Sequence, residues 1–61
     1  MPIVTIKMLE GRTDEQKKAL VEKVTEAVVE TVNAPAEAVT IVIEEMAKNH
    51  YAKAGVRASD Q

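Results

Sequence analysis

The chain is organised around the segment Pro2-Ile3-Val4-Thr5-Ile6-Lys7-Met8-Leu9-Glu10-Gly11-Arg12. Residues 3–9 are rich in β-branched side chains, and this composition predicts a strand. Because successive side chains of a strand point to opposite faces, Ile3, Thr5 and Lys7 share one face. The other face carries Val4, Ile6 and Met8. Both faces are partly apolar, so we expect this strand to lie inside a sheet or an interface.

A long amphipathic helix is predicted over residues 13–33. Thr13 and Gln16 have the spacing of a capping box, in which each side chain accepts a hydrogen bond from the other residue's backbone N–H. Asn33 readily takes the left-handed conformation that ends helices. The apolar stripe expected to face the core consists of Leu20, Val24, Ala27, Val28 and Val32.

A second strand is predicted over residues 39–46, because Val39 to Ile43 form a nearly continuous apolar run. A strand, a helix and another strand predict a right-handed parallel β-α-β crossover. The tail over residues 48–58 has the small and turn-forming residues of a turn or short hairpin. The sequence therefore predicts one domain over residues 2–61. Its fold class is α/β (α+β), with a single β-α-β unit followed by a turn or hairpin. Two strands leave one sheet face wet, so partner chains are expected to cover it.

Size and composition also predict that the chain forms an oligomer. The chain has 61 residues and no cysteine, yet 46% of its residues are hydrophobic. A monomer this small cannot bury that much apolar surface, so we expect a homo-oligomer. A net charge of -2 and a single aromatic residue argue against a nucleic-acid partner. No apolar run approaches the roughly 20 residues that span a bilayer. We therefore expect no membrane partner, no metal or other cofactor, and a soluble cytoplasmic protein.

Pro2 is the first candidate for chemistry. A chain whose second residue is as small as proline usually loses Met1, and the Pro2 nitrogen then becomes a free secondary amine. An apolar pocket with nearby cations disfavours the protonated form and lowers the pKa of such an amine, which turns it into a usable general base. The alternative is that Pro2 only begins the strand, a position where proline is well tolerated.

Arg12 is the second candidate. It lies between a glycine and the expected helix cap, where anions are favoured. The alternative is an exposed arginine in a surface ion pair. If the strand is extended, Pro2 and Arg12 are about 30 Å apart. They can serve one site only if the arginine comes from a neighbouring chain.

Three motifs give the sequence a specific resemblance. They are Pro-Ile at the start, Leu-Glu-Gly-Arg at residues 9–12 and Glu-Met-Ala-Lys at residues 45–48. Together they closely resemble the 4-oxalocrotonate tautomerase family, over nearly the whole chain. The resemblance implies a tautomerase fold completed by oligomerisation, with Pro2 as the general base. It also implies that Arg12 binds a substrate carboxylate and that Tyr51 and Leu9 contact the substrate.

One position departs from the family pattern. Its best-known members have a second arginine at the start of the second long strand, where this chain has Thr40. The tail cations Lys53 and Arg57 are conceivable substitutes, although no spacing supports either. The departure favours monoacid over diacid substrates. His50, the only histidine, is not assigned to the site, because a lone histidine near a surface turn is more often structural or exposed than catalytic. Glu44 and Glu45 make a poor catalytic pair, because adjacent strand residues point to opposite faces.

The resemblance implies a cofactor-independent tautomerase for a small 2-oxo or 2-hydroxydienoate acid. It also implies a small-molecule carboxylate substrate, a homohexamer and a role in aromatic degradation. A hydratase or dehalogenase of the same superfamily is a close alternative. A non-catalytic homo-oligomeric assembly module, built by the apolar strands, is the alternative of a different class.

Overall fold

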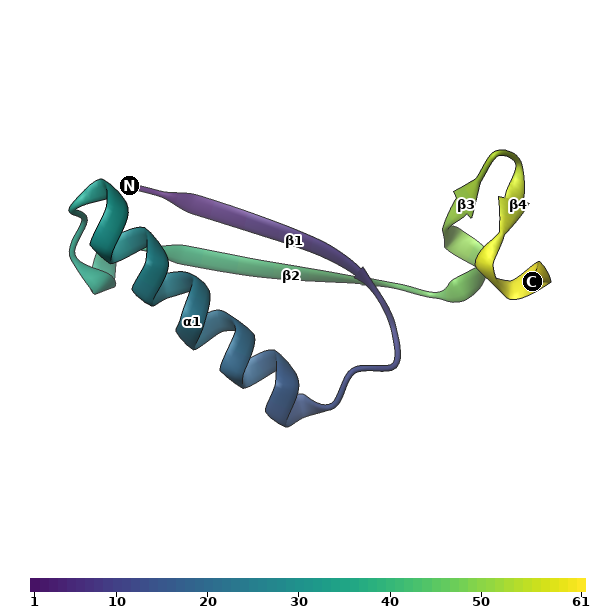
Figure 1. The fold of residues 1–61 in the computed structure, drawn as a ribbon, viewed down its shortest axis with the longest axis horizontal. Helices are drawn as coiled ribbons and strands as arrows, with labels where there is room; N and C mark the ends of the chain where they lie inside the picture. Colours follow the sequence, from purple (N-terminus) through teal and green to yellow (C-terminus); the bar gives the residue numbers. More distant parts are fainter.

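The computed structural model describes residues 1–61 and has two parts, a β-α-β unit and a small carboxyl-terminal hairpin (Figure 1). The predicted β-α-β unit with parallel strands is confirmed. The hairpin projects beyond the end of the sheet (Figure 1). The elements, in chain order, are β1 (Ile3–Leu9), α1 (Asp14–Val32), the 3-10 helix η1 (Ala36–Ala38), β2 (Thr40–Met46), the 3-10 helix η2 (Lys48–His50), β3 (Ala52–Lys53), β4 (Val56–Arg57) and the 3-10 helix η3 (Ala58–Asp60).

Strands β1 and β2 pair in parallel along their whole length, with Ile3 opposite Thr40 and Leu9 opposite Met46. At one end the N–H of Thr40 donates to the carbonyl of Pro2 at 3.0 Å. The prediction that the second strand begins at residue 39 was early by one residue. The N–H of Val39 instead donates to the carbonyl of Ala36 at 3.1 Å and so closes η1.

Helix α1 has the caps that the sequence predicts. The N–H of Gln16 donates to Thr13 Oγ1 at 3.1 Å, and the N–H of Thr13 donates to Gln16 Oε1 at 2.9 Å. Asn33 follows the helix with φ of 56°. The predicted range 13–33 therefore consists of the helix and its two caps.

The predicted apolar stripe of α1 is partly wrong. Ala27 and Val32 are exposed, whereas Val21 and Val29 are partly buried beside the stripe. The partly buried apolar positions follow the i, i+4 pattern along one side of the helix. A sheet of only two strands is narrow, and it leaves Val32 in the last turn uncovered.

The two sheet faces differ in cover. Helix α1 lies along one of them (Figure 1). On that face Lys17 Nζ lies 2.9 Å from Glu45 Oε1, so an ion pair ties the helix to β2. The opposite face carries Ile3 and Val42, which are 62% and 40% exposed. No element of the chain covers this partly apolar face.

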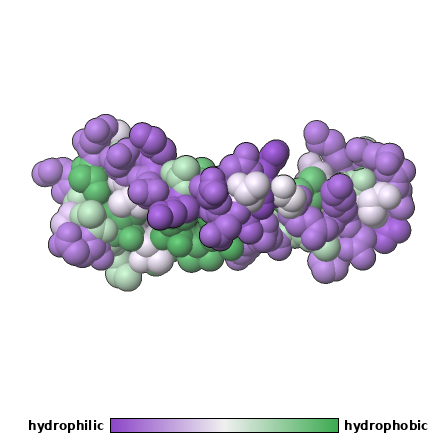
Figure 2. Space-filling view, turned by 90° about the horizontal axis from the view of Figure 1, so that it is seen from below, coloured by the Kyte–Doolittle hydropathy of each residue, from purple (hydrophilic) through white to green (hydrophobic).

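The shape of the single chain is that of an incomplete unit. No residue is fully buried, and the accessible surface is 4776 Å². A compact monomer of this mass exposes roughly 3,900 Å². The radius of gyration is 14.5 Å, against about 10.5 Å for a compact domain of this length. Figure 2 shows hydrophobic surface along the β-α-β part and a narrow waist before the hairpin. One chain alone does not build a closed core.

Of the two alternatives that the sequence predicts, a turn or a short hairpin, the tail forms the hairpin, with a two-residue turn. Ala54 and Gly55 have φ of 52° and 82°, and β3 and β4 pair in an antiparallel manner around them. The N–H of Ala58 donates to the carbonyl of Tyr51 at 2.9 Å and closes the base of the hairpin. No helix of the chain is long and apolar enough to cross a bilayer.

Candidate active site

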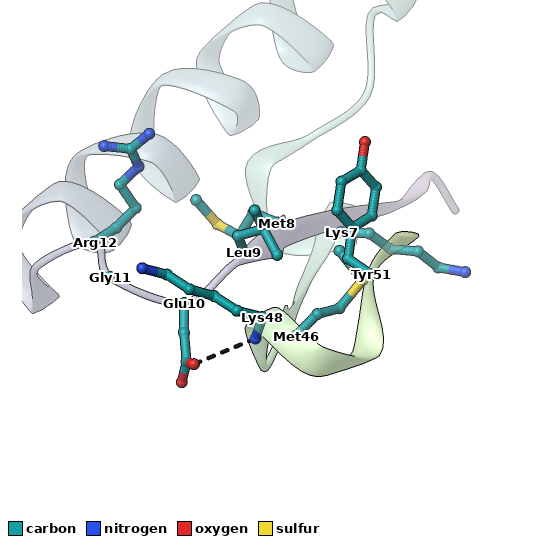
Figure 3. A pocket seen from close by; sticks show the side chains of 9 residues that line it. All are labelled: Lys7, Met8, Leu9, Glu10, Gly11, Arg12, Met46, Lys48 and Tyr51. Atoms are coloured by element: carbon teal, nitrogen blue, oxygen red, sulfur yellow. Dashed lines mark hydrogen bonds between the residues drawn. The ribbon is translucent and has the colours of Figure 1, made fainter. Parts of the chain in front are cut away.

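A cavity of about 530 Å³ lies where β1 ends, at the end of the sheet nearest the hairpin. Its residues come from β1, from the turn before α1 and from the segment after β2 (Figure 3). Three of the four residues that the resemblance assigns to the site lie here, namely Leu9, Arg12 and Tyr51. The remaining lining residues are Lys7, Met8, Glu10, Gly11, Met46 and Lys48.

The turn from β1 to α1 places Arg12 at the cavity. Gly11 has φ of 120°, a conformation that side-chain-bearing residues rarely adopt, so a glycine is required here. Arg12 follows directly and precedes Thr13, the N-cap of α1. The capping box fixes the first turn of the helix, and the backbone that carries the guanidinium is therefore held from both sides.

Glu10 joins the two motif segments that form the cavity. Its N–H donates to the carbonyl of Met46 at 2.9 Å, which extends the β1–β2 ladder beyond the strands. Its Oε2 accepts a hydrogen bond from the N–H of Lys48 at 3.4 Å, across 38 residues of sequence. The Leu-Glu-Gly-Arg turn is thus attached directly to the Glu-Met-Ala-Lys segment.

The cavity has a cationic side and an apolar side. Figure 3 shows Arg12 on one side and the ring of Tyr51 on the other, with Met8 and Leu9 between them. Tyr51 is 37% exposed, so its ring is available at the cavity. A guanidinium is a group that can bind a carboxylate, and an apolar wall is suited to the carbon chain of a small ligand.

Pro2 lies elsewhere. It is at the opposite end of β1 from the cavity, as the amino terminus in Figure 1 shows, and it does not line the cavity. Its carbonyl is fixed by the N–H of Thr40, so the first residues of the chain are held against β2. Met1 is 90% exposed and projects from the sheet. While Met1 is attached, the Pro2 nitrogen is a tertiary amide without a basic lone pair.

The departure from the family pattern concerns Thr40 and the two tail cations, Lys53 and Arg57. Thr40 lies beside Pro2, so the missing arginine concerns the Pro2 end of the sheet. Arg57 binds Asp60 within its own chain, with Nε and Nη2 donating to the two carboxylate oxygens at 2.8 and 3.3 Å. Neither Arg57 nor Lys53 lines the cavity.

Lys48 is a cavity residue that sequence reasoning missed. Lys48 belongs to the Glu-Met-Ala-Lys motif, but the resemblance to the family assigns it no role. Only the contact between its backbone and Glu10 shows that it shares a cavity with Arg12. The distance in sequence between the two motifs hides this proximity, and no local pattern could have revealed it.

Comparison with known proteins identifies the class of protein. Residues 2–61 match the family described as tautomerase enzyme. The chain is 68% identical over 60 residues to the 2-hydroxymuconate tautomerase of Bacillus subtilis, with 98% of this chain and 97% of the relative covered.

Two solved structures share the fold. One is YwhB, a homologue of 4-oxalocrotonate tautomerase, with a TM-score of 0.95 and 67% identity over 98% of each chain. The other is the heterohexameric 4-oxalocrotonate tautomerase of Chloroflexus aurantiacus, with a TM-score of 0.93 and 30% identity. That likeness covers 98% of this chain and 97% of the other. The chain therefore belongs to the 4-oxalocrotonate tautomerase family, and it is an isomerase.

Proposed function

We propose that this chain is a cofactor-independent keto–enol tautomerase for a small 2-oxo or 2-hydroxydienoate acid. The observation that carries the proposal is the cavity that unites Arg12, Leu9 and Tyr51, a carboxylate-binding cation facing an apolar and aromatic wall. The relative in Bacillus subtilis is named a 2-hydroxymuconate tautomerase, and 2-hydroxymuconate is a 2-hydroxydienoate with two carboxylates. The name therefore supports the 2-hydroxydienoate class and not the preference for monoacids.

In the proposed reaction the Pro2 nitrogen is the only base required. After Met1 is removed, its lone pair takes the proton of the 2-hydroxyl group. The C–O bond becomes a carbonyl, the double-bond electrons shift to a carbon of the chain, and that carbon receives the proton back from Pro2. Arg12 neutralises the substrate carboxylate throughout.

Pro2 and Arg12 act together across a subunit boundary in this proposal. The two residues lie at opposite ends of β1, and the open, partly apolar sheet face, which carries the exposed Ile3 and Val42, offers a surface for a neighbouring chain. A second copy placed there can bring its Arg12 end to the Pro2 end of the first. We propose a homohexamer, which is supported by the hexameric assembly of the Chloroflexus aurantiacus relative.

Mixed oligomers test the shared site. A subunit that retains Met1 lacks the base, and Arg12→Ala lacks the carboxylate-binding group, so each alone is expected to be nearly inactive. Mixing unfolded chains in equal amounts and refolding them restores both groups in about one quarter of sites if the site is shared. No recovery on mixing, in oligomers that sedimentation shows to be intact, would rule out the shared site.

A further inference from the structure

Two cations line the Arg12 side of the cavity, and neither is neutralised within the chain. The ion pairs of the chain use other cations, namely Lys7 with Glu44, Lys17 with Glu45, Lys23 with Glu26 and Arg57 with Asp60. Arg12 and Lys48 have no carboxylate within 4.0 Å, although both line the same cavity.

The side chain of Lys48 reaches back to the turn that carries Arg12, and the guanidinium of Arg12 extends from this turn in another direction (Figure 3). Figure 3 shows the lysine side chain extended back from η2, with its ammonium on the cationic side of the cavity. Lys7, by contrast, points away from Arg12 and lies 3.9 Å from Glu44 on the open sheet face. Lys48 is therefore the second cation of the Arg12 side.

Glu10 does not cancel this charge. Its carboxylate points away from the two cations in Figure 3, and it accepts a hydrogen bond from the backbone N–H of Lys48 at 3.4 Å. This contact holds the backbone of Lys48 beside the turn that carries Arg12. The Glu10 carboxylate thus holds the backbone of Lys48 and forms no ion pair with its ammonium group.

We propose that Lys48 is a substrate-binding residue whose ammonium binds the same carboxylate as the Arg12 guanidinium. This inference rests on the proposed function, and it adds a residue that sets the preference for anionic substrates. A carboxylate has about four lone-pair positions, so it accepts two hydrogen bonds from the arginine fork and a third from lysine.

Binding of an inert probe tests the inference without any turnover. Sorbate is a six-carbon dienoate monocarboxylate without a hydroxyl group, and sorbamide is its neutral counterpart. Tyr51 is the only aromatic residue, so its ring resonances report occupancy of the cavity. We expect Lys48→Met to weaken sorbate binding about tenfold, the range of a charge-assisted hydrogen bond, and to leave sorbamide unchanged.

Two further variants complete the experiment. Lys48→Arg keeps the charge and is expected to retain most of the sorbate affinity. Lys18→Met removes a charge from an exposed position of α1 outside the cavity, and it is expected to have no effect. Equal loss for sorbate and sorbamide, or unchanged sorbate binding in Lys48→Met, would overturn the proposal.

The same experiment separates this proposal from the proposed function. If the wild-type protein binds sorbate through Lys48 but does not convert a 2-hydroxydienoate, the tautomerase assignment of the site fails and the role of Lys48 in carboxylate binding stands. If the protein converts the dienoate while Lys48→Met binds sorbate as the wild type does, only the role of Lys48 fails.

Discussion

The two ends of the β1–β2 sheet differ in the groups they present: main-chain groups at the Pro2 end and side chains at the cavity end. At the Pro2 end a main-chain carbonyl and the N–H of Thr40 hold the chain, and the group proposed for chemistry is the main-chain nitrogen itself. At the other end four charged side chains and an aromatic ring surround a cavity. A base made from the backbone needs only a fixed chain terminus. Binding of a substrate needs side chains from separate segments.

The difference also concerns how each end is held. Glu10 forms two hydrogen bonds at the cavity, one to Met46, the last residue of β2, and one to Lys48, whereas Pro2 is held by one hydrogen bond from Thr40. The cavity is therefore formed within one chain. In the proposed oligomer, the Pro2 end is completed by another chain, and variants at each end should therefore give different kinds of loss.

Retention of Met1 should have the largest effect, a complete loss of turnover on a 2-hydroxydienoate. The Pro2 nitrogen is then an amide without a basic lone pair, so the proposed general base is absent. Mass spectrometry defines the processed and unprocessed forms, and circular dichroism compares their folding. Undiminished activity in the form that keeps Met1 would end the proposal that Pro2 is the base.

The processed protein should also show a rate that rises with pH as the Pro2 nitrogen loses its proton. The midpoint is expected below that of an exposed proline amine, because an apolar site and a neighbouring Arg12 both disfavour positive charge and lower the pKa. Pro2→Ala keeps an amine in the same place and should retain partial activity with a shifted profile. An identical profile in both proteins would assign the titration to another group.

Arg12→Ala should have the next largest effect, at the opposite end. Loss of the charge-assisted hydrogen bonds to a carboxylate should lower kcat/KM about 100-fold for a carboxylate substrate. A neutral keto–enol substrate should be nearly unaffected, and Arg12→Lys should retain part of the activity because it keeps the charge. Equal losses on both substrates would make Arg12 a structural residue.

Thr40→Arg should shift the substrate preference toward dicarboxylates. A cation beside Pro2 can bind a second carboxylate, so the ratio of kcat/KM for a dicarboxylate over a monocarboxylate should rise about tenfold. Thr40→Met is the matched control for added bulk without charge. If the two variants shift the ratio alike, charge at this position does not control substrate choice.

Thr13→Ala should have the smallest effect, on stability instead of chemistry. Removal of the capping hydroxyl should lower the free energy of unfolding by about 1 kcal/mol. Denaturant unfolding at constant subunit concentration measures this change. Thr31→Ala is the control, because Thr31 Oγ1 donates to the carbonyl of Ala27 within the helix and caps nothing. A similar loss in both variants would contradict a specific capping contribution.

Local patterns were sufficient for most of the fold. The strand over residues 3–9 follows from its β-branched composition, and the helix ends follow from Thr13 and Asn33, because these are short-range effects. The start of β2 was misplaced by one residue, because the N–H of Val39 is used by η1. Ala27 and Val32 were wrongly assigned to the buried stripe. Periodicity indicates which side of a helix is apolar, but not how wide a sheet covers that side.

The sequence by itself determined the β-α-β order, because periodicity is a property of neighbouring residues. Its motifs carry the resemblance to the family, and this resemblance named Leu9 and Tyr51 as site candidates beside Pro2 and Arg12. Only the tertiary structure decided that Arg12, Leu9 and Tyr51 share one cavity, that Pro2 lies at the other end, and that Lys48 joins Arg12. The physical reason is the parallel pairing of β1 with β2, which brings residues 38 positions apart into hydrogen-bond contact and holds the two ends of each strand apart.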